Sequence, residues 1–74
     1  MKAREVISII ERNGGQFVRQ RGSHRLYRLT VQVGDHHITC HTTVAGHGAK
    51  DIPSGTLSKI ERDLAPLLGK GWLK

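Results

Sequence analysis

A chain of 74 residues with 36% hydrophobic residues and a single Trp, Tyr and Phe is too small for a second domain or a deep cofactor cavity. Twelve Lys and Arg residues against six Asp and Glu give a formal charge of +6, which favours a polyanionic partner. The single cysteine, Cys40, excludes an internal disulfide and a cysteine-rich zinc site. No apolar run approaches the roughly 18 residues of a membrane span, and Met1–Glu5 lack the apolar stretch of a signal peptide, so we expect a soluble, cytoplasmic protein with no membrane partner.

The first predicted element is an amphipathic helix over residues 3–12. Its apolar residues recur at the three- and four-residue spacing of one helix face, at Ala3, Val6, Ile7 and Ile10. The run Asn13-Gly14-Gly15 predicts its end, because Asn and Gly tolerate the left-handed backbone that closes a helix C-terminus.

Three strands are predicted next, over residues 16–20, 24–33 and 36–44, with Gly34-Asp35 as a tight turn between the last two. In the third strand small and apolar residues, Cys40 among them, alternate with histidines and threonines, so we expect one buried face and one wet face. In the second strand Leu26 and Leu29 are three residues apart, so their side chains point to opposite faces of the sheet. The sequence leaves open which of the two faces the helices.

A second helix is predicted after a glycine-rich loop over residues 45–50. Ser54 is placed to cap it, Leu57, Ile60 and Leu64 form its apolar stripe, and Pro66 should kink it or begin a separate turn. Residues 69–74 could be a loosely attached tail, in which Trp72 is more readily a packing anchor than a base-stacking platform. The order of helix, three strands and helix indicates one α+β domain over residues 1–74, with two helices against a small sheet.

The strongest candidate for chemistry is a histidine among arginines. Between Glu11 and Asp35 there is no acidic residue, and this segment contains His24 together with Arg12, Arg19, Arg21, Arg25 and Arg28. Arginine forks grip phosphate oxygens, an imidazole exchanges protons near neutral pH, and RNA supplies its own nucleophile, the 2′-hydroxyl. The segment therefore suits a metal-free RNA-cleaving site.

Other chemistries find little support. His37 and His41 share a strand face but lie about 13 Å apart along an extended strand, too far for one ion, so we expect no metal site. There is no Gly-rich phosphate loop for a nucleotide cofactor, no Ser-His-Asp arrangement and no pair of carboxylates, and we expect no cofactor. The alternative for His36, His37 and His41 is a solvated face that adds hydrogen-bond donors to the basic surface.

Several motifs together resemble the HicA-type (YcfA-like) mRNA interferase toxins of type II toxin–antitoxin modules. They are the N-terminal helix ending at Asn13-Gly14, then Phe17-Val18, Gly22-Ser23-His24, His47 in the loop after the third strand, and the run KDIPSGTL from Lys50 to Leu57, followed by Ile60. The resemblance covers residues 4 to about 64.

This resemblance implies an α-β-β-β-α fold like that of double-stranded-RNA-binding domains, with a three-stranded antiparallel sheet and both helices on one of its faces. It also implies ribosome-independent cleavage of mRNA that depends on His24, and inhibition by a HicB-type antitoxin that covers the active face. Gly22 and Ser23 would shape the turn that presents His24. Lys50 matches the motif before the second helix, where phosphate contacts are plausible.

The first hypothesis is thus a toxin endoribonuclease with His24 as general acid or base. Its RNA-binding residues are expected to be Arg19, Arg21, Ser23, Arg25, Arg28 and Lys50. The alternative is a non-catalytic RNA-binding module that uses the same basic surface. A third reading, compatible with the first, is an interaction domain whose positive face docks an acidic protein.

Overall fold

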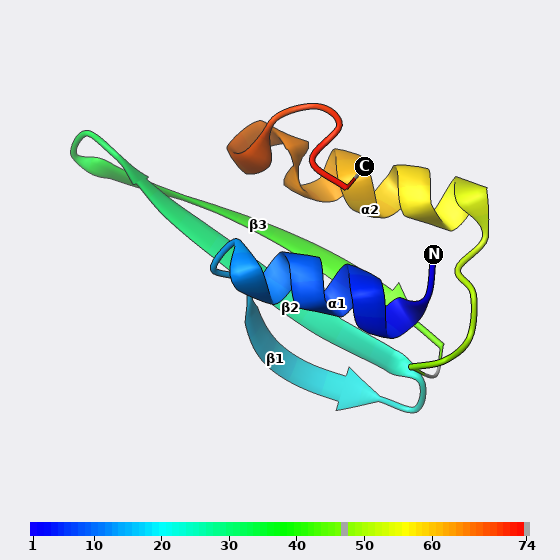
Figure 1. Cartoon of the computed structure of the whole chain (residues 1–74). Coiled ribbons are helices and arrows are strands. Elements are labelled where there is room, and N and C mark those ends of the chain that lie inside the picture. Colours follow the sequence, from blue (N-terminus) through cyan, green and yellow to red (C-terminus); the bar gives the residue numbers. More distant parts are fainter. Residues whose placement is uncertain (47, 74) are drawn as a thin grey trace.

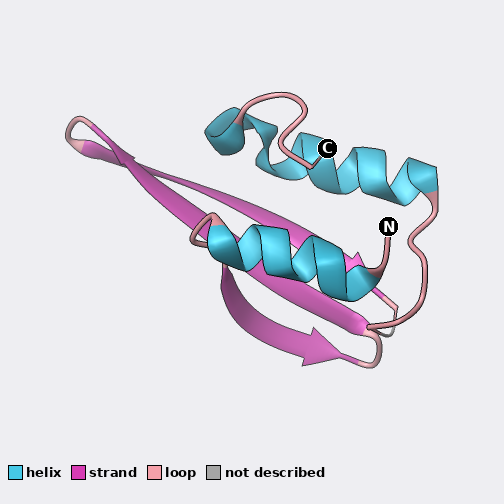
Figure 2. Cartoon of the chain, in the orientation of Figure 1, coloured by secondary structure: helices cyan, strands magenta, loops and turns pink. Residues whose placement is uncertain are grey.

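The computed structural model describes residues 1–46 and 48–73. Its elements are helix α1 (Ala3–Arg12), strands β1 (Gln16–Arg21), β2 (His24–Val33) and β3 (His36–Ala45), and helix α2 (Ser54–Leu68). The strands form one antiparallel sheet in the order β1-β2-β3, and both helices lie on the same face of it (Figures 1 and 2). The predicted α+β class and element order are confirmed. No helix in the described ranges has both the length and the apolar character needed to cross a membrane.

Helix α1 buries its predicted stripe, with Ala3, Val6 and Ile10 each at most 1% exposed. It ends where the glycines begin, and the Gly15 N–H donates a hydrogen bond to the Ile10 carbonyl oxygen at 2.9 Å. A Cβ at residue 15 would lie 2.9 Å from that same oxygen and 2.3 Å from the Ile10 Cγ2. The tight return of the chain from α1 into β1 therefore requires glycine at this position.

Strands β2 and β3 pair without interruption from His24–Ala45 to Val33–His36, and Gly34, at a φ of 61°, closes the turn between them. Tyr27 and Leu29 are buried beneath the helices, so Leu26 points to the opposite face, which settles the parity left open by the sequence. The alternation predicted for β3 is confirmed by Thr42, which is 2% exposed, while its neighbour His41 is exposed. The Thr42 hydroxyl donates a hydrogen bond of 3.0 Å to the Asp63 carboxylate on α2.

Strand β1 is the short edge strand, and it contains a bulge. Phe17 is opposite Tyr27 and Arg19 is opposite Leu26, so Val18 is an extra residue with no partner of its own. A bulge reverses the alternation of side chains beyond it. As a result Phe17 faces the helices, whereas Arg19 and Arg21 both point to the other face of the sheet.

Helix α2 completes the core with Ile60 and Leu64, which are at most 1% exposed. The predicted Ser54 cap is wrong, because the N-cap is Pro53 with no side-chain cap and Ser54 is the first helical residue. The separate turn at Pro66 is also wrong, because Pro66 lies within the helix, which continues to Leu68. Pro66 has no N–H to donate to the Arg62 carbonyl oxygen, and the kink expected there stays a prediction.

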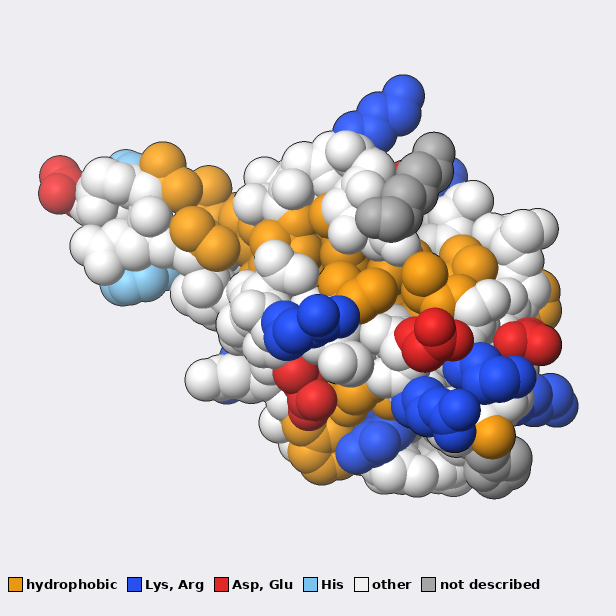
Figure 3. Space-filling view, viewed as in Figure 1, with side chains coloured by type: hydrophobic (Ala, Val, Ile, Leu, Met, Phe, Trp, Pro, Cys, Tyr) orange, Lys and Arg blue, Asp and Glu red, His pale blue; other side chains and the backbone are white. Residues whose placement is uncertain are grey.

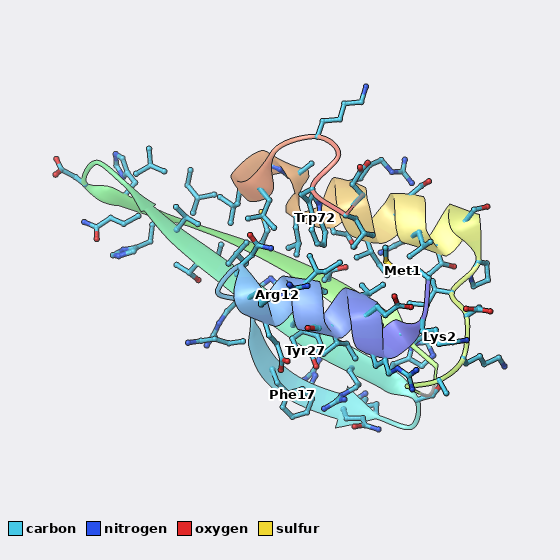
Figure 4. All side chains as sticks on the ribbon, viewed as in Figure 1. Met1, Lys2, Arg12, Phe17, Tyr27 and Trp72 are labelled. Carbon is cyan, nitrogen blue, oxygen red and sulfur yellow. The ribbon has the colours of Figure 1, made fainter. Side chains whose placement is uncertain are left out.

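The C-terminal residues pack on the domain rather than trailing from it. The Trp72 Nε1–H donates a hydrogen bond of 2.7 Å to the Glu61 carbonyl, and Leu73 is only 5% exposed (Figure 4). Trp72 is therefore a packing anchor, as predicted, and the loosely attached tail suggested by the sequence is not observed over residues 69–73. Lys74 lies outside the described residues.

The β2–β3 hairpin projects past the ends of both helices (Figure 1), and its tip stands clear of the rest of the molecule in the space-filling view (Figure 3). Its helix-facing side carries Val33 and Ile38, which are 53% and 42% exposed because neither helix reaches them. The sheet is thus longer than the core it covers.

Candidate functional site

The sheet face opposite the helices, which we call the outer face, carries the candidate functional residues. Its members follow from the strand register: Gln16, Arg19, Arg21, His24, Leu26, Arg28, Thr30, Gln32, His37, Thr39, His41, Thr43 and Ala45. Among these described residues are three arginines and three histidines and no carboxylate. Because no helix of the described chain covers it, this basic face is open to solvent.

A hollow of about 150 Å³ surrounds His24 on the outer face. All three strands contribute to its lining, which consists of Arg19, Arg21, His24, Leu26 and Thr43. Arg21 is the cross-strand partner of His24, and Arg19 and Thr43 flank Leu26 from either side. The hollow thus gathers two guanidinium groups, an exposed imidazole and a hydroxyl above an apolar floor, which suits a phosphodiester with its attached sugar or base.

The turn that presents His24 is held by hydrogen bonds on both sides. Gly22 has a φ of 57°, the left-handed conformation that favours glycine. The Gln20 side-chain amide donates to the Gly22 carbonyl at 2.7 Å, and the Gly46 N–H donates to the Ser23 carbonyl at 3.1 Å. These hydrogen bonds link the turn to β1 on one side and to the loop after β3 on the other. They therefore fix the position of His24 at the start of β2.

Arg25 is not brought together with His24, because it points to the helix-facing side of β2. Its guanidinium carbon lies 5.0 Å from the ring centroid of Phe17 and 6.0 Å from that of Tyr27. The two rings contact each other edge to face at 5.9 Å (Figure 4). Burial raises the pKa of the Tyr27 phenol, an effect that the Arg25 charge opposes. These three residues contact one another on the helix-facing side of the sheet, apart from the hollow, and Phe17 remains 48% exposed.

The remaining candidates lie around or away from the hollow. Lys50 is exposed in the loop that leaves β3, and its carbonyl oxygen accepts a 3.1 Å hydrogen bond from the Ala3 N–H. His37 and His41 share the outer face as predicted, whereas His36 is on the helix-facing side. His47 lies outside the described residues. Within residues 1–46 and 48–73, no three His, Cys, Asp or Glu side chains are close enough together to hold a metal ion.

A larger hollow of about 280 Å³ lies between α2 and the two chain ends. Its lining is mostly apolar. Of the described side chains that line it, only that of Glu61 is acidic or basic. A lone carboxylate with no basic partner offers little for acid–base chemistry, so the hollow around His24 is the better candidate.

Sequence reasoning did not identify Leu26 and Thr43 as parts of the site. Both are half-buried residues of ordinary strand composition, and only the cross-strand register places them beside His24 and Arg19. The one available signal was the alternation along β3, which already set Thr43 on its wet face.

Comparison with known proteins identifies the family. The family model described as the HicA toxin of bacterial toxin–antitoxin systems matches residues 3–65, from the start of α1 to the last turns of α2. Neither the curated proteins nor the solved structures include a match to the chain. The matched range includes every residue that lines the hollow around His24 and covers most of the chain. This chain therefore belongs to the HicA family of toxins from bacterial toxin–antitoxin systems.

Proposed function

We propose that the protein is a metal-independent endoribonuclease that cleaves mRNA without the ribosome, with His24 as general acid or base. The observation that carries the proposal is that His24 shares one solvent-open hollow with Arg19 and Arg21. Membership of a toxin family supports a damaging activity of this kind.

The reaction needs only groups that the hollow, the RNA and solvent water supply. The 2′-hydroxyl attacks the adjacent phosphorus, so that the O2′–P bond forms while the P–O5′ bond breaks. The proton lost by the 2′-hydroxyl and the proton gained by the 5′-oxygen balance: the imidazole of His24 mediates one of these transfers, and solvent water mediates the other. Arg19 and Arg21 neutralise the charge that accumulates on the phosphorane oxygens.

The surrounding basic groups hold the substrate. Arg28 extends the outer face beyond the hollow, while Ser23 in the turn and Lys50 in the loop after β3 are placed at the His24 end of the sheet. Arg25 stabilises the fold through Phe17 and contributes no RNA contact. The protein acts in the cytoplasm, where its mRNA substrates are.

Family membership also implies a cognate antitoxin. We propose that it is of the HicB type and neutralises the toxin by covering the outer face. Because that face carries arginines and no carboxylate among the described residues, the covering surface should be acidic.

The proposal is tested by incubating a long, mixed-sequence RNA with substoichiometric protein at neutral pH in EDTA. We expect each protein molecule to cleave many RNA molecules, and we expect a fully 2′-O-methylated RNA of the same sequence to remain intact because its nucleophile is blocked. Cleavage that stops in EDTA, or that extends to the methylated RNA, contradicts the proposed mechanism.

The second candidate function is a non-catalytic RNA-binding module. The observation in its favour is that the basic outer face extends well beyond the hollow, to His41 and His37. It predicts RNA binding whose affinity falls steeply with salt, without any turnover in the cleavage assay.

Two arginines four residues apart should behave differently. Arg21→Ala is expected to weaken RNA binding roughly tenfold and to reduce the salt dependence of binding, because one charge-assisted phosphate contact is lost. Arg25→Ala should leave RNA affinity unchanged and lower the free energy of unfolding by about 0.5–2 kcal/mol, because a partly desolvated cation–π contact is lost. Filter binding across a salt series and urea unfolding measure the two effects. Equal losses of RNA affinity would show that the two faces do not differ in RNA binding.

A further inference from the structure

We propose that the outer face of the projecting β2–β3 hairpin is an RNA subsite that holds the nucleotides adjoining the cleaved phosphate in single-stranded form. Its contact residues are Gln32, His37 and His41, which continue the line begun by Arg28. This inference rests on the proposed function, because it names further contacts for the substrate of the same site.

The subsite is a ladder of polar cross-strand pairs in register with the hollow. Moving away from His24, the pairs are Leu26–Thr43, Arg28–His41, Thr30–Thr39 and Gln32–His37. Every pair presents at least one hydrogen-bonding side chain and none presents a carboxylate. The residues beyond the first pair are all exposed. The ladder therefore extends the basic surface with groups that contact phosphates, riboses and base edges.

Two hydrogen bonds orient the side chains of this ladder. The hydroxyls of Thr30 and Thr39 are 2.9 Å apart and link the two strands across the outer face. The Gln32 side-chain amide donates to the Gly34 carbonyl at 3.2 Å, which directs its amide oxygen away from the turn as an acceptor. Side chains already held in place lose less conformational freedom on binding than free ones do.

The hairpin is amphipathic, and only one of its faces matches RNA. Its helix-facing side carries Val31, Val33 and Ile38, and the last two are largely exposed. Extending the strands beyond the helices adds little to the core and exposes apolar surface, which costs stability. The extension of the two strands does lengthen the polar outer face next to the hollow. A role in binding the substrate therefore accounts for the length of the hairpin.

The geometry favours a single strand over a duplex. Successive pairs on one face of a sheet are about 6.6 Å apart, so the ladder from Leu26 to Gln32 runs for about 20 Å. A few nucleotides of extended RNA can lie along this strip with their bases splayed over the sheet, which is how other sheet surfaces bind single-stranded RNA. An A-form duplex offers such a strip only the phosphates of one strand and keeps its bases paired.

The test measures binding of fluorescein-labelled, 2′-O-methylated RNA by anisotropy, since the methyl groups prevent cleavage. A single-stranded dinucleotide, with its one phosphodiester, is short enough to occupy the hollow alone, and a decamer also reaches the hairpin. For Gln32→Ala/His37→Ala, and separately for His41→Ala, we expect the Kd of the decamer to rise by about five- to tenfold, as expected for one or two lost hydrogen bonds. The Kd of the dinucleotide should change by less than about twofold, because the hollow itself is intact.

His36→Ala is the matched control, because His36 neighbours His37 in the chain but points to the helix-facing side. It should leave both affinities unchanged. Equal losses for the dinucleotide and the decamer, unchanged decamer binding by the double variant, or an equal loss in His36→Ala would each overturn the subsite. Tighter binding of the decamer after annealing to its complement would overturn the single-stranded assignment.

Failure of the subsite is distinguishable from failure of the proposed function. If the hairpin variants bind the decamer as the wild type does while the wild type still cleaves RNA in EDTA, only the subsite is wrong, and the hairpin is then available to the antitoxin. If the wild type neither binds these oligonucleotides nor cleaves RNA, both proposals fail.

Discussion

His24→Ala is expected to slow RNA cleavage by about 10²- to 10⁴-fold, the usual contribution of a general acid or base. The loss should be in the catalytic rate constant rather than in RNA affinity, because Arg19 and Arg21 still line the hollow and bind the phosphate. His24 is exposed, so its removal leaves the core untouched and the unfolding midpoint should change little. Single-turnover cleavage rates with protein in excess over RNA measure the effect directly.

His36→Ala provides the matched control for this experiment. His36 is an exposed histidine at the far end of the sheet and on the helix-facing side, so its replacement should leave the cleavage rate unchanged. Full cleavage by His24→Ala would remove His24 from the mechanism. Another group would then have to carry the proton transfer, whereas absence of cleavage by both proteins, with salt-sensitive RNA binding by both, would leave only the reading as a binding module.

Ile60→Ala is expected to have the largest effect on stability, lowering the free energy of unfolding by about 2–5 kcal/mol. Ile60 has no exposed surface and lies in the single hydrophobic cluster that both helices and the sheet share. A domain of 74 residues has a total stability of only about 4–11 kcal/mol. The variant should therefore lose a large part of its stability and be partly unfolded well below the wild-type midpoint.

Urea unfolding followed by fluorescence measures this loss, since Trp72 is the only tryptophan and hydrogen-bonds to the Glu61 carbonyl of α2. Arg62→Ala, on the exposed side of the same helix, should change the free energy of unfolding by less than about 0.5 kcal/mol. Similar midpoints for the two variants would mean that α2 does not form the core as described.

The elements of the fold could be predicted because each has a local signal. The apolar stripe of α1 and the glycines after it marked that helix to within a residue, and the alternation along β3 identified its buried side. The Ser54 cap and the separate turn at Pro66 were wrong because both are propensities that tertiary packing overrides. Pro53 takes the N-cap position, and α2 continues past Pro66 to Leu68.

The composition of the hollow was less accessible to sequence reasoning. The tripeptide Gly22-Ser23-His24 and the neighbouring arginines drew attention to the segment that lines the hollow. Local sequence does not reveal that Arg25 packs on Phe17 while Arg21 lines the hollow, because the distinction depends on strand parity. Leu26 and Thr43 come together through pairing between strands nearly twenty residues apart, which is a property of the sheet and not of either segment.

The extra residue in β1 has a consequence for reading natural variants of this chain. If Val18 were deleted, every residue of the Gly-Ser-His motif and every arginine would remain, and an alignment would score the variant as intact. Regular alternation would then place Phe17 on the helix-facing side and Arg19 with Arg21 beside His24, because without Val18 the two arginines have the opposite parity to Phe17. Deletion of Gln20 with the bulge kept would instead turn Arg19 and Arg21 to opposite faces of the sheet. The position of a deletion between Phe17 and His24 is therefore a stricter criterion for an intact site than the presence of the motif itself.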